Sequence, residues 1–266
     1  MARTHPEGVP LRADYGDGSY RRCIVLEAGE GWARGELVDD FHHFAARIEH
    51  ADGCVVAIAG EDVRVPWTTC PGAVRPLEAL IGARLGRDFA QVGRHTDSRS
   101  QCTHLYDAAC LAICHAARQR NGGAKTRRYD FVLPDRRDGS ARPTLDRDGE
   151  RILDWQVSGL QIAEAWPREF AHQPLRGEAW NALFARISDP DLAEAAGVMR
   201  RAVFIGLGRQ YDFEQIERAS SFAPLVGAAC HTFSAERVGE ALRVHGSVRD
   251  FHGSPERMLE RDTEAD

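Results

Sequence analysis

Lysine is almost absent from this sequence, and so are the motifs that identify several common enzyme classes. Lys125 is the only lysine among the 34 basic residues, so positive charge comes almost entirely from arginine. The chain has no glycine-rich dinucleotide fingerprint, no phosphate-binding loop and no nucleophile elbow. It also has no CxxC pair and no HExxH motif, so any metal site must use a less common ligand spacing.

Long hydrophobic runs are also missing. No segment approaches the roughly 18 apolar residues that a membrane span needs. The N-terminal stretch MARTHPEGVPLRADYGDGSYRR lacks the apolar core of a signal peptide. We therefore expect a cytoplasmic protein with reduced thiols and no membrane partner. The net charge of −6 offers no basic surface for nucleic acid.

The remaining composition is that of a globular protein with a sizeable core, since 43% of its 266 residues are hydrophobic. Seven cysteines, an odd number without framework spacing, indicate free thiols or metal ligands. We expect an extended arm (1–20), a metal-binding α+β core (21–125), a β-hairpin and helical extension that shares this core (126–253), and a charged tail (254–266).

Alternating apolar and polar residues predict most of the strands. RRCIVLEA (21–28) indicates one strand, and residues 36–67 predict an antiparallel meander with a hairpin turn at Asp52-Gly53. A further strand is expected in RRYDFVLPD (127–135), followed by a hairpin that turns at Asp148-Gly149. The predicted fold class is thus α+β, an antiparallel β-meander with helices packed on one face, plus a C-terminal hairpin and helical layer.

Helices are predicted from apolar periodicity and from residues that begin or end helices. In the first half they cover residues 68–82 and a buried segment from Cys102 to Arg120. After Pro167 the helical stretches are GEAWNALFARI, DLAEAAGVMRRAVFIGL and SAERVGEALRVHG.

An acid and a histidine at the start of the second meander strand are candidate metal ligands. Phe44, Ala46 and Ile48 share one face of this strand, and counting back by twos places His42 and Asp40 on the same face. A buried carboxylate must be paired, hydrogen-bonded or metal-bound. Alternatively, the strand starts later and DDFHH is a solvated loop. It also remains open whether Asp39 is the ligand in place of Asp40, and whether His43 or His104 is the ligand in place of His42.

Two cysteines near expected helix starts complete a possible ligand set. Cys70 and Cys102 each lie in a first helical turn, where the helix dipole favours a thiolate. The alternative for Cys70 is a small buried residue at a turn. Cys110 and Cys114 lie among apolar residues and are expected in the core. The predicted ligands of Zn²⁺, or alternatively Fe²⁺, are therefore Asp40, His42, Cys70 and Cys102.

The order of these motifs resembles that of iron–sulfur scaffold proteins of the IscU, SufU and NifU N-terminal type. The resemblance covers roughly residues 36–120, and rests on TTCPGAVRPLEALIG and CTHLYDAACLAICHAA. It implies a SufE/NifU-like core in which Cys70 and Cys102 match metal-binding cysteines and Asp40 matches the family aspartate. Val38 replaces the first family cysteine, which favours a mononuclear site over a cluster.

A second resemblance rests on PWTTCPGA, CTHLYDAA and RDGERILDW. These stretches make the chain similar to an uncharacterised bacterial family, a domain of unknown function, which brings no activity with it.

From these observations we expect a metal-dependent enzyme of hydrolase, hydratase or lyase type that acts on a small organic substrate. Aromatic or carboxylated substrates are both options, since Arg200, Arg201 and Arg209 could meet a carboxylate. His104, His43 or Tyr106 would carry a proton. The alternatives are an accessory role in iron–sulfur assembly or sulfur transfer, and a structural zinc protein. A homo-oligomer is compatible with the sequence.

Overall fold

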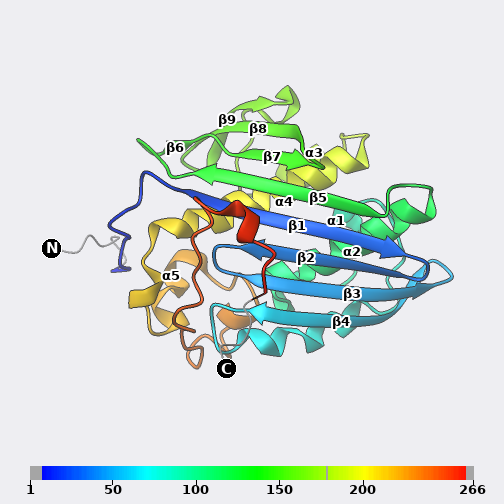
Figure 1. Cartoon of the computed structure of the whole chain (residues 1–266), viewed down its shortest axis with the longest axis horizontal. Coiled ribbons are helices and arrows are strands. Elements are labelled where there is room, and N and C mark those ends of the chain that lie inside the picture. The colour runs from blue at the N-terminus through cyan, green and yellow to red at the C-terminus, as the bar shows by residue number, and fades with distance from the viewer. Residues whose placement is uncertain (1–7, 178, 262–266) are drawn as a thin grey trace.

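A single antiparallel sheet organises the computed structural model, which describes residues 8–177 and 179–261 (Figure 1). The nine strands found there have the order β4-β3-β2-β1-β5-β7-β8-β6, and β9 pairs with β8. This confirms an α+β fold built on an antiparallel sheet. The strands are β1 (Ser19–Gly29), β2 (Trp32–Asp39), β3 (His43–Ala51), β4 (Cys54–Arg64), β5 (Thr126–Pro134), β6 (Ser140–Ala141), β7 (Thr144–Arg147), β8 (Glu150–Ser158) and β9 (Gln161–Trp166).

Two long helices cover one face of this sheet. α2 packs against β1, β2 and β3, while α4 packs against β5, β7 and β8, and both lie behind the sheet in Figure 1. The α-helices are α1 (Phe89–Val92), α2 (Thr103–Arg120), α3 (Ala179–Phe184), α4 (Pro190–Gly206) and α5 (Ala223–Val226). The 3-10 helices are η1 (Cys70–Ala73), η2 (Arg75–Leu80), η3 (Ser98–Ser100), η4 (Arg168–Phe170), η5 (Leu207–Gln210), η6 (Phe213–Gln215), η7 (Ala219–Ser221), η8 (His231–Phe233) and η9 (Pro255–Arg257).

Small residues let α2 approach the sheet closely. A Cβ atom added to Gly35 of β2 would lie 2.3 Å from the carbonyl oxygen of Ala108 in α2. Cys110 and Cys114 are buried on the same helix, as expected of core residues. This contact fixes the start of α2 beside the turn between β2 and β3, where the candidate site lies.

The two predicted hairpin turns are confirmed. Asp52 and Gly53 both have positive φ angles, 50° and 78°, and join β3 to β4. Asp148 and Gly149, with φ angles of 53° and 87°, join β7 to β8. Two-residue turns of this sort need φ > 0 at both positions, which explains why Asp-Gly pairs predicted them.

Two predicted helices differ in the structure. Residues 68–82 form the short 3-10 helices η1 and η2 rather than one α-helix, and each contains a proline in its first turn. Pro76 lacks the N–H group that a continuous α-helix over this range would use. Residues 234–246 form no helix, because Leu242 and Arg243 instead make isolated bridges with Arg218 and Trp67.

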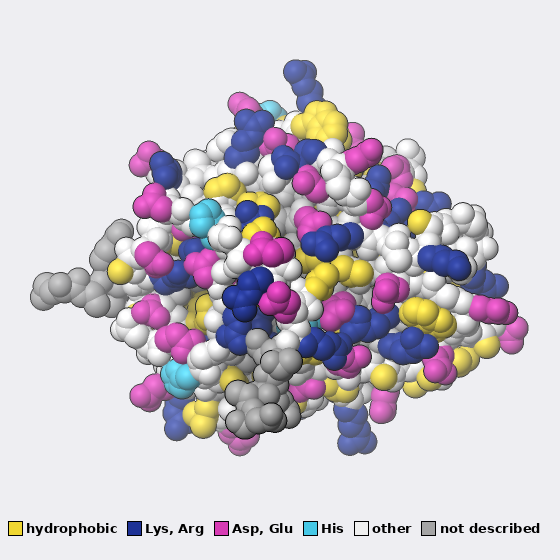
Figure 2. All heavy atoms as spheres, in the orientation of Figure 1, with side chains coloured by type: hydrophobic (Ala, Val, Ile, Leu, Met, Phe, Trp, Pro, Cys, Tyr) yellow, Lys and Arg dark blue, Asp and Glu magenta, His cyan; other side chains and the backbone are white. Residues whose placement is uncertain are grey.

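The sheet joins the two halves of the chain. β1 pairs with β5 over nine residue pairs, from Ser19 opposite Pro134 to Glu27 opposite Thr126. The side of the sheet away from the helices carries the last described segment, where Phe251 and Met258 pack with Cys23 and Val38. Figure 2 shows basic and acidic side chains interspersed over this side. No helix in residues 8–177 or 179–261 has the length and apolar run that a bilayer crossing requires.

Candidate metal centre and its pocket

The candidate site is built on the turn that follows β2. Asp39 ends the strand, and its Oδ1 accepts hydrogen bonds from the backbone N–H groups of Phe41 and His42, both at 2.9 Å. An aspartate that binds the backbone two residues ahead forms an Asx-turn. The Arg64 guanidinium also donates to the carbonyl oxygens of Asp39 and Asp40, at 2.6 and 3.2 Å. These bonds hold the turn in one conformation.

Asp39 is the fully buried anion of the site. Its Oδ2 accepts a hydrogen bond from the Tyr20 hydroxyl at 2.7 Å and forms a salt bridge with Arg22 Nη2, also at 2.7 Å. Burial alone would raise the pKa of Asp39, but His42 and Arg22 hold it well below its usual range. Asp39 is therefore ionised, with both oxygens facing hydrogen-bond donors.

Two histidines stack beside this carboxylate. His42 Nδ1 lies 2.9 Å from Asp39 Oδ1, and His104 Nε2 lies 4.0 Å from Asp39 Oδ2. The imidazole centroids are 3.7 Å apart, with an interplanar angle of 23°. Burial lowers the pKa of both rings, and for His104 the neighbouring His42 lowers it further. Both imidazoles are therefore neutral near pH 7, which is the form that binds metals.

Asp39, His42 and His104 form a group that could hold a metal ion. One ligand atom from each residue lies within 4.8 Å of the others. His104 Nε2 is buried without a hydrogen-bond partner, which is what an unliganded metal ligand would show. Because the stacked rings are nearly parallel, one imidazole must rotate before both nitrogens can reach the same ion. Two histidines and one carboxylate would leave coordination positions open.

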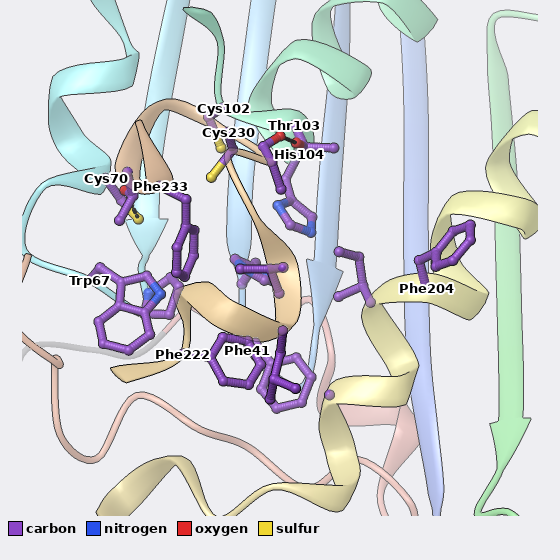
Figure 3. A pocket seen from close by; sticks show the side chains of 18 of the residues that line it. Phe41, Trp67, Cys70, Cys102, Thr103, His104, Phe204, Phe222, Cys230 and Phe233 are labelled. Carbon is purple, nitrogen blue, oxygen red and sulfur yellow. Dashed lines mark hydrogen bonds between the residues drawn. The ribbon is translucent and has the colours of Figure 1, made fainter. Parts of the chain in front are cut away.

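A pocket of about 260 Å³ opens beside this group. Figure 3 shows Cys102 and His104 reaching it from the start of α2, with Cys70, Trp67 and Phe233 along another wall. The lining is mostly apolar and rich in aromatic side chains, and it comes from segments far apart in the chain. Its aromatic residues are Phe41, Trp67, Phe204, Tyr211, Phe213, Phe222 and Phe233.

Asp40, the expected carboxylate ligand, lies outside this group. It is 1% exposed, and neither of its oxygens has a hydrogen-bond partner. Arg209 Nε lies 3.7 Å from Asp40 Oδ2, but the same guanidinium bonds to Asp135 and Asp250. Burial, followed by the charge of Asp39, raises the pKa of Asp40 well above its usual range. The charge of Arg209 opposes this shift but does not offset it, so Asp40 keeps its proton to a higher pH than a free carboxyl group does.

Three residues were expected to carry a proton, and only His104 reaches the pocket. His43 lies on the opposite face of the sheet, where its Nε2 contacts Glu36 Oε1 at 2.7 Å. The Tyr106 hydroxyl donates to the carbonyl of Gly93 at 3.2 Å, and this residue is not among those that line the pocket.

The cysteines expected as ligands reach the pocket without joining the Asp39 group. Cys70 and Cys102 both line it, together with Cys230. Cys70 Sγ lies 3.4 Å from Thr232 Oγ1. Burial raises the pKa of Cys70 to about 11 and raises that of Cys102 well above its usual range. The helix dipole does not overcome this desolvation, because Cys70 begins a single 3-10 turn and Cys102 only caps α2.

The strand before the turn contained the information that identifies Asp39. Gly35, Leu37 and Asp39 alternate along β2 and share the face that α2 covers, opposite Leu26, Ile24 and Arg22 of β1. Counting back from β3 failed because residues 40–42 form a turn and break the alternation. His104 was expected as an acid or base, and its ligation of the metal in place of His42 was left open.

Comparison with known proteins adds a family match without an activity. Residues 28–119 match the family model described as "Protein of unknown function (DUF2889)". This range contains all three members of the Asp39 group, whereas RDGERILDW lies beyond it. No curated protein matches the chain. These comparisons give no support to a resemblance with IscU, SufU or NifU scaffolds, or to a SufE/NifU-like core. Residues 28–119 are thus similar to a domain of unknown function.

Proposed function

We propose that this protein is a metal-dependent enzyme, of lyase, hydratase or hydrolase type, that acts on a small aromatic substrate. The observation that carries the proposal is the buried Asp39, His42 and His104 group beside an aromatic pocket. Zn²⁺ or Fe²⁺ suits two neutral imidazoles and one carboxylate. A metal held there would supply Lewis acidity to a substrate oxygen or lower the pKa of a bound water.

The chain's own residues prepare the site for this chemistry. Arg22 and Tyr20 keep Asp39 ionised and fixed in position. Asp39 in turn holds the His42 ring in place, because its Oδ1 lies 2.9 Å from His42 Nδ1. Phe41, Phe44 and the stacked His104 keep water away from the His42 ring. Open positions remain for substrate because three residues, not four, form the group.

A metal-free acid–base enzyme is a second candidate, and one observation favours it. The Asp39 oxygens already face donors from Tyr20, Arg22 and His42, so the carboxylate needs no metal to balance its charge. Asp39 and His42 would then act as a dyad in which the carboxylate holds the tautomer of a catalytic base. His104 would polarise the substrate.

The sulfur-transfer alternative has less support. The three pocket thiols would have to be thiolates to accept sulfur, yet burial raises the pKa of Cys70, Cys102 and Cys230. A persulfide on any of them, found by mass spectrometry of the intact protein, would favour that alternative.

Metal analysis tests the proposal directly. We expect about one equivalent of Zn²⁺ or Fe²⁺ per chain in protein purified without chelator, measured by plasma mass spectrometry. His104→Ala and Asp39→Asn should each lower the metal affinity by 10-fold or more, because each removes one of three ligands.

The chain offers matched controls for both substitutions. His43→Ala and Asp40→Asn alter the adjacent histidine and the adjacent aspartate, and should leave metal content unchanged. Imidazole ¹⁵N spectra separate the two candidates, because Zn²⁺ should shift the His104 Nε2 resonance only if it binds there. Full-length protein that takes up no metal, with a His42 ring unaffected by added Zn²⁺, would refute the metal proposal and favour the dyad.

A further inference from the structure

An arginine with unused donors lies buried in the aromatic pocket. Arg243 is 5% exposed, and its guanidinium carbon lies 5.6 Å from the Trp67 ring centre and 5.5 Å from that of Phe213. Its Nη1 donates to the carbonyl of Pro66 at 2.6 Å. Its Nε and Nη2 have no hydrogen-bond partner. Buried polar atoms without partners are rare in native proteins and need an explanation.

The unused edge is the one that binds carboxylates elsewhere in this protein. Arg128 donates hydrogen bonds to Asp130 from Nε and Nη2, at 2.7 and 2.8 Å. Arg12 donates to Asp14 from the same two atoms, at 3.0 and 2.7 Å. An arginine fork of this kind matches the two oxygens of a carboxylate. In Arg243 neither donor of that fork makes a hydrogen bond.

The neighbouring acid, Glu214, forms a loose ion pair with Arg243 and does not engage both donors of the fork. Glu214 Oε1 lies 3.6 Å from Arg243 Nη2, which is beyond hydrogen-bond distance. Its Oε2 accepts a hydrogen bond from the Gly246 N–H at 2.9 Å, and nearly half of the side chain is exposed. Burial lowers the pKa of Arg243, although Glu214 partly opposes the shift. An anion at the fork would offset the cost of burying this charge.

The backbone fixes Arg243 in place on the pocket wall. Arg243 forms an isolated bridge with Trp67, and the N–H of Val244 donates to the Pro66 carbonyl at 3.0 Å. A continuous row of rings then leads to the metal group. The ring centroids of Phe213 and Phe41 are 5.1 Å apart, and those of Phe41 and His42 are 6.1 Å apart.

From this geometry we propose that the substrate is an aromatic carboxylate. Its carboxylate pairs with the Nε/Nη2 edge of Arg243, and its ring lies along Phe213 and Phe41 toward His42 and His104. That the ligand is the substrate rests on the proposed function, whereas carboxylate binding at Arg243 does not. The arginines that the sequence suggested for a carboxylate serve other contacts: Arg200 with Leu175, Arg201 with Asp107, and Arg209 with Asp135 and Asp250.

Benzoate, benzamide and phenol are suitable probes because they share one ring and differ in the polar group. Binding to the full chain would be measured by calorimetry, with ligand-observed NMR for weak binders. We expect benzoate to bind at least 10-fold more tightly than benzamide, and this preference to persist in 0.5 M NaCl, because a buried pair is screened little.

Arg243→Met should abolish the preference for benzoate, and Arg243→Lys should reduce it because lysine lacks the fork. Arg176→Met is the matched control, since Arg176 is an exposed arginine that lines the same pocket. It should leave the preference intact. If Arg243→Met does not fold, the benzoate and benzamide affinities of the wild-type protein and of Arg243→Lys still test the inference.

Equal affinity of the wild-type protein for benzoate and benzamide would overturn the inference. So would a preference that survives Arg243→Met, and phenol binding more tightly than benzoate would point to a phenolic ligand instead. Metal removal with a chelator separates this inference from the proposed function, because benzoate affinity should then change less than threefold. If the protein binds no metal but still prefers benzoate through Arg243, the proposed function fails while the carboxylate site remains supported.

Discussion

Asp39 and Asp40 are neighbours in sequence and both are buried, yet their surroundings shift their pKa values in opposite directions. Asp39 is held ionised by Arg22 and His42, whereas Asp40 has no hydrogen-bond donor at either oxygen. Asp39 is the last residue of β2 and lies beside His104 of α2, whereas Asp40 begins the turn that follows the strand. The charge state of each carboxyl group depends on its immediate neighbours more than on burial alone.

Replacing Asp40 with asparagine should therefore stabilise the protein at neutral pH. The pKa of Asp40 is raised in the folded state, so the folded protein binds more protons than the unfolded chain from about pH 3.8 up to that raised pKa. The contribution of this group to stability is thus lost as the pH rises through that range. We expect Asp40→Asn to raise the free energy of unfolding by about 1 kcal/mol at pH 7, measured by denaturant titration.

The same measurement near pH 3.5 should show little gain, because the unfolded carboxyl group is then largely protonated as well. Asp250→Asn is the matched control, since Asp250 accepts a hydrogen bond from the same Arg209 at 2.8 Å and is partly exposed. It should be neutral or slightly destabilising at pH 7. If Asp250→Asn stabilised the protein as much as Asp40→Asn, this would contradict the opposite pKa shifts of Asp39 and Asp40.

At the scale of elements, the contact between β2 and α2 positions the metal group. Gly35 and Asp39 belong to β2, while Ala108 and His104 belong to α2, so a shift between the two elements moves one ligand away from another. We expect Gly35→Ala to destabilise the protein by about 3 kcal/mol, because its Cβ would meet the Ala108 backbone at 2.3 Å. Metal affinity should fall together with the thermal midpoint.

Gly60→Ala on β4 provides the comparison. Its Cβ would meet the side-chain atoms of Leu77, Leu105 and Val74 at 3.0–3.3 Å, and such side chains can adjust. The cost should be roughly 1 kcal/mol or less, with metal affinity unchanged. If Gly35→Ala proved as mild as Gly60→Ala, close packing of α2 would not be what sets the distance between Asp39 and His104.

The strands and hairpins could be predicted from sequence because their causes are local. Alternation of apolar residues and the positive φ angles of Asp-Gly turns act within a few residues, and both turns occur where expected. The helix over residues 234–246 was wrong because its helical spacing is overruled by tertiary pairing of Arg243 with Trp67. Local propensity is a weak guide wherever distant segments compete for the same backbone groups.

For the site, the residue types could be predicted but their grouping could not. His42, Cys70, Cys102 and His104 do line one pocket, whereas the predicted Asp40 does not. Which of them share an ion depends on the turn at residues 40–42, where side-chain hydrogen bonds decide the path of the chain. Arg243 was overlooked because nothing near it in sequence shows that Trp67 and Phe213 enclose it.

At the scale of the whole molecule, the sheet and the pocket both join the two halves of the chain. β1 of the first half pairs with β5 of the second, and α4 contacts strands from both halves. The pocket takes His42 and Cys102 from one half and Phe213 and Arg243 from the other. A shared core of this kind should unfold as one cooperative unit, because neither half can keep its apolar face buried alone.

We therefore expect one unfolding transition for both halves. In native-state hydrogen exchange with increasing denaturant, peptides from β2 and β3 and peptides from β8 should converge on the same opening free energy. Benzoate should raise that value in both sets equally, because a ligand of the folded state stabilises the whole cooperative unit. If β8 opened at lower denaturant while β2 and β3 stayed protected, and benzoate protected only the latter, the second half would be a separate unit. Arg243 would then have to reach the pocket without the cooperative core that now places it there.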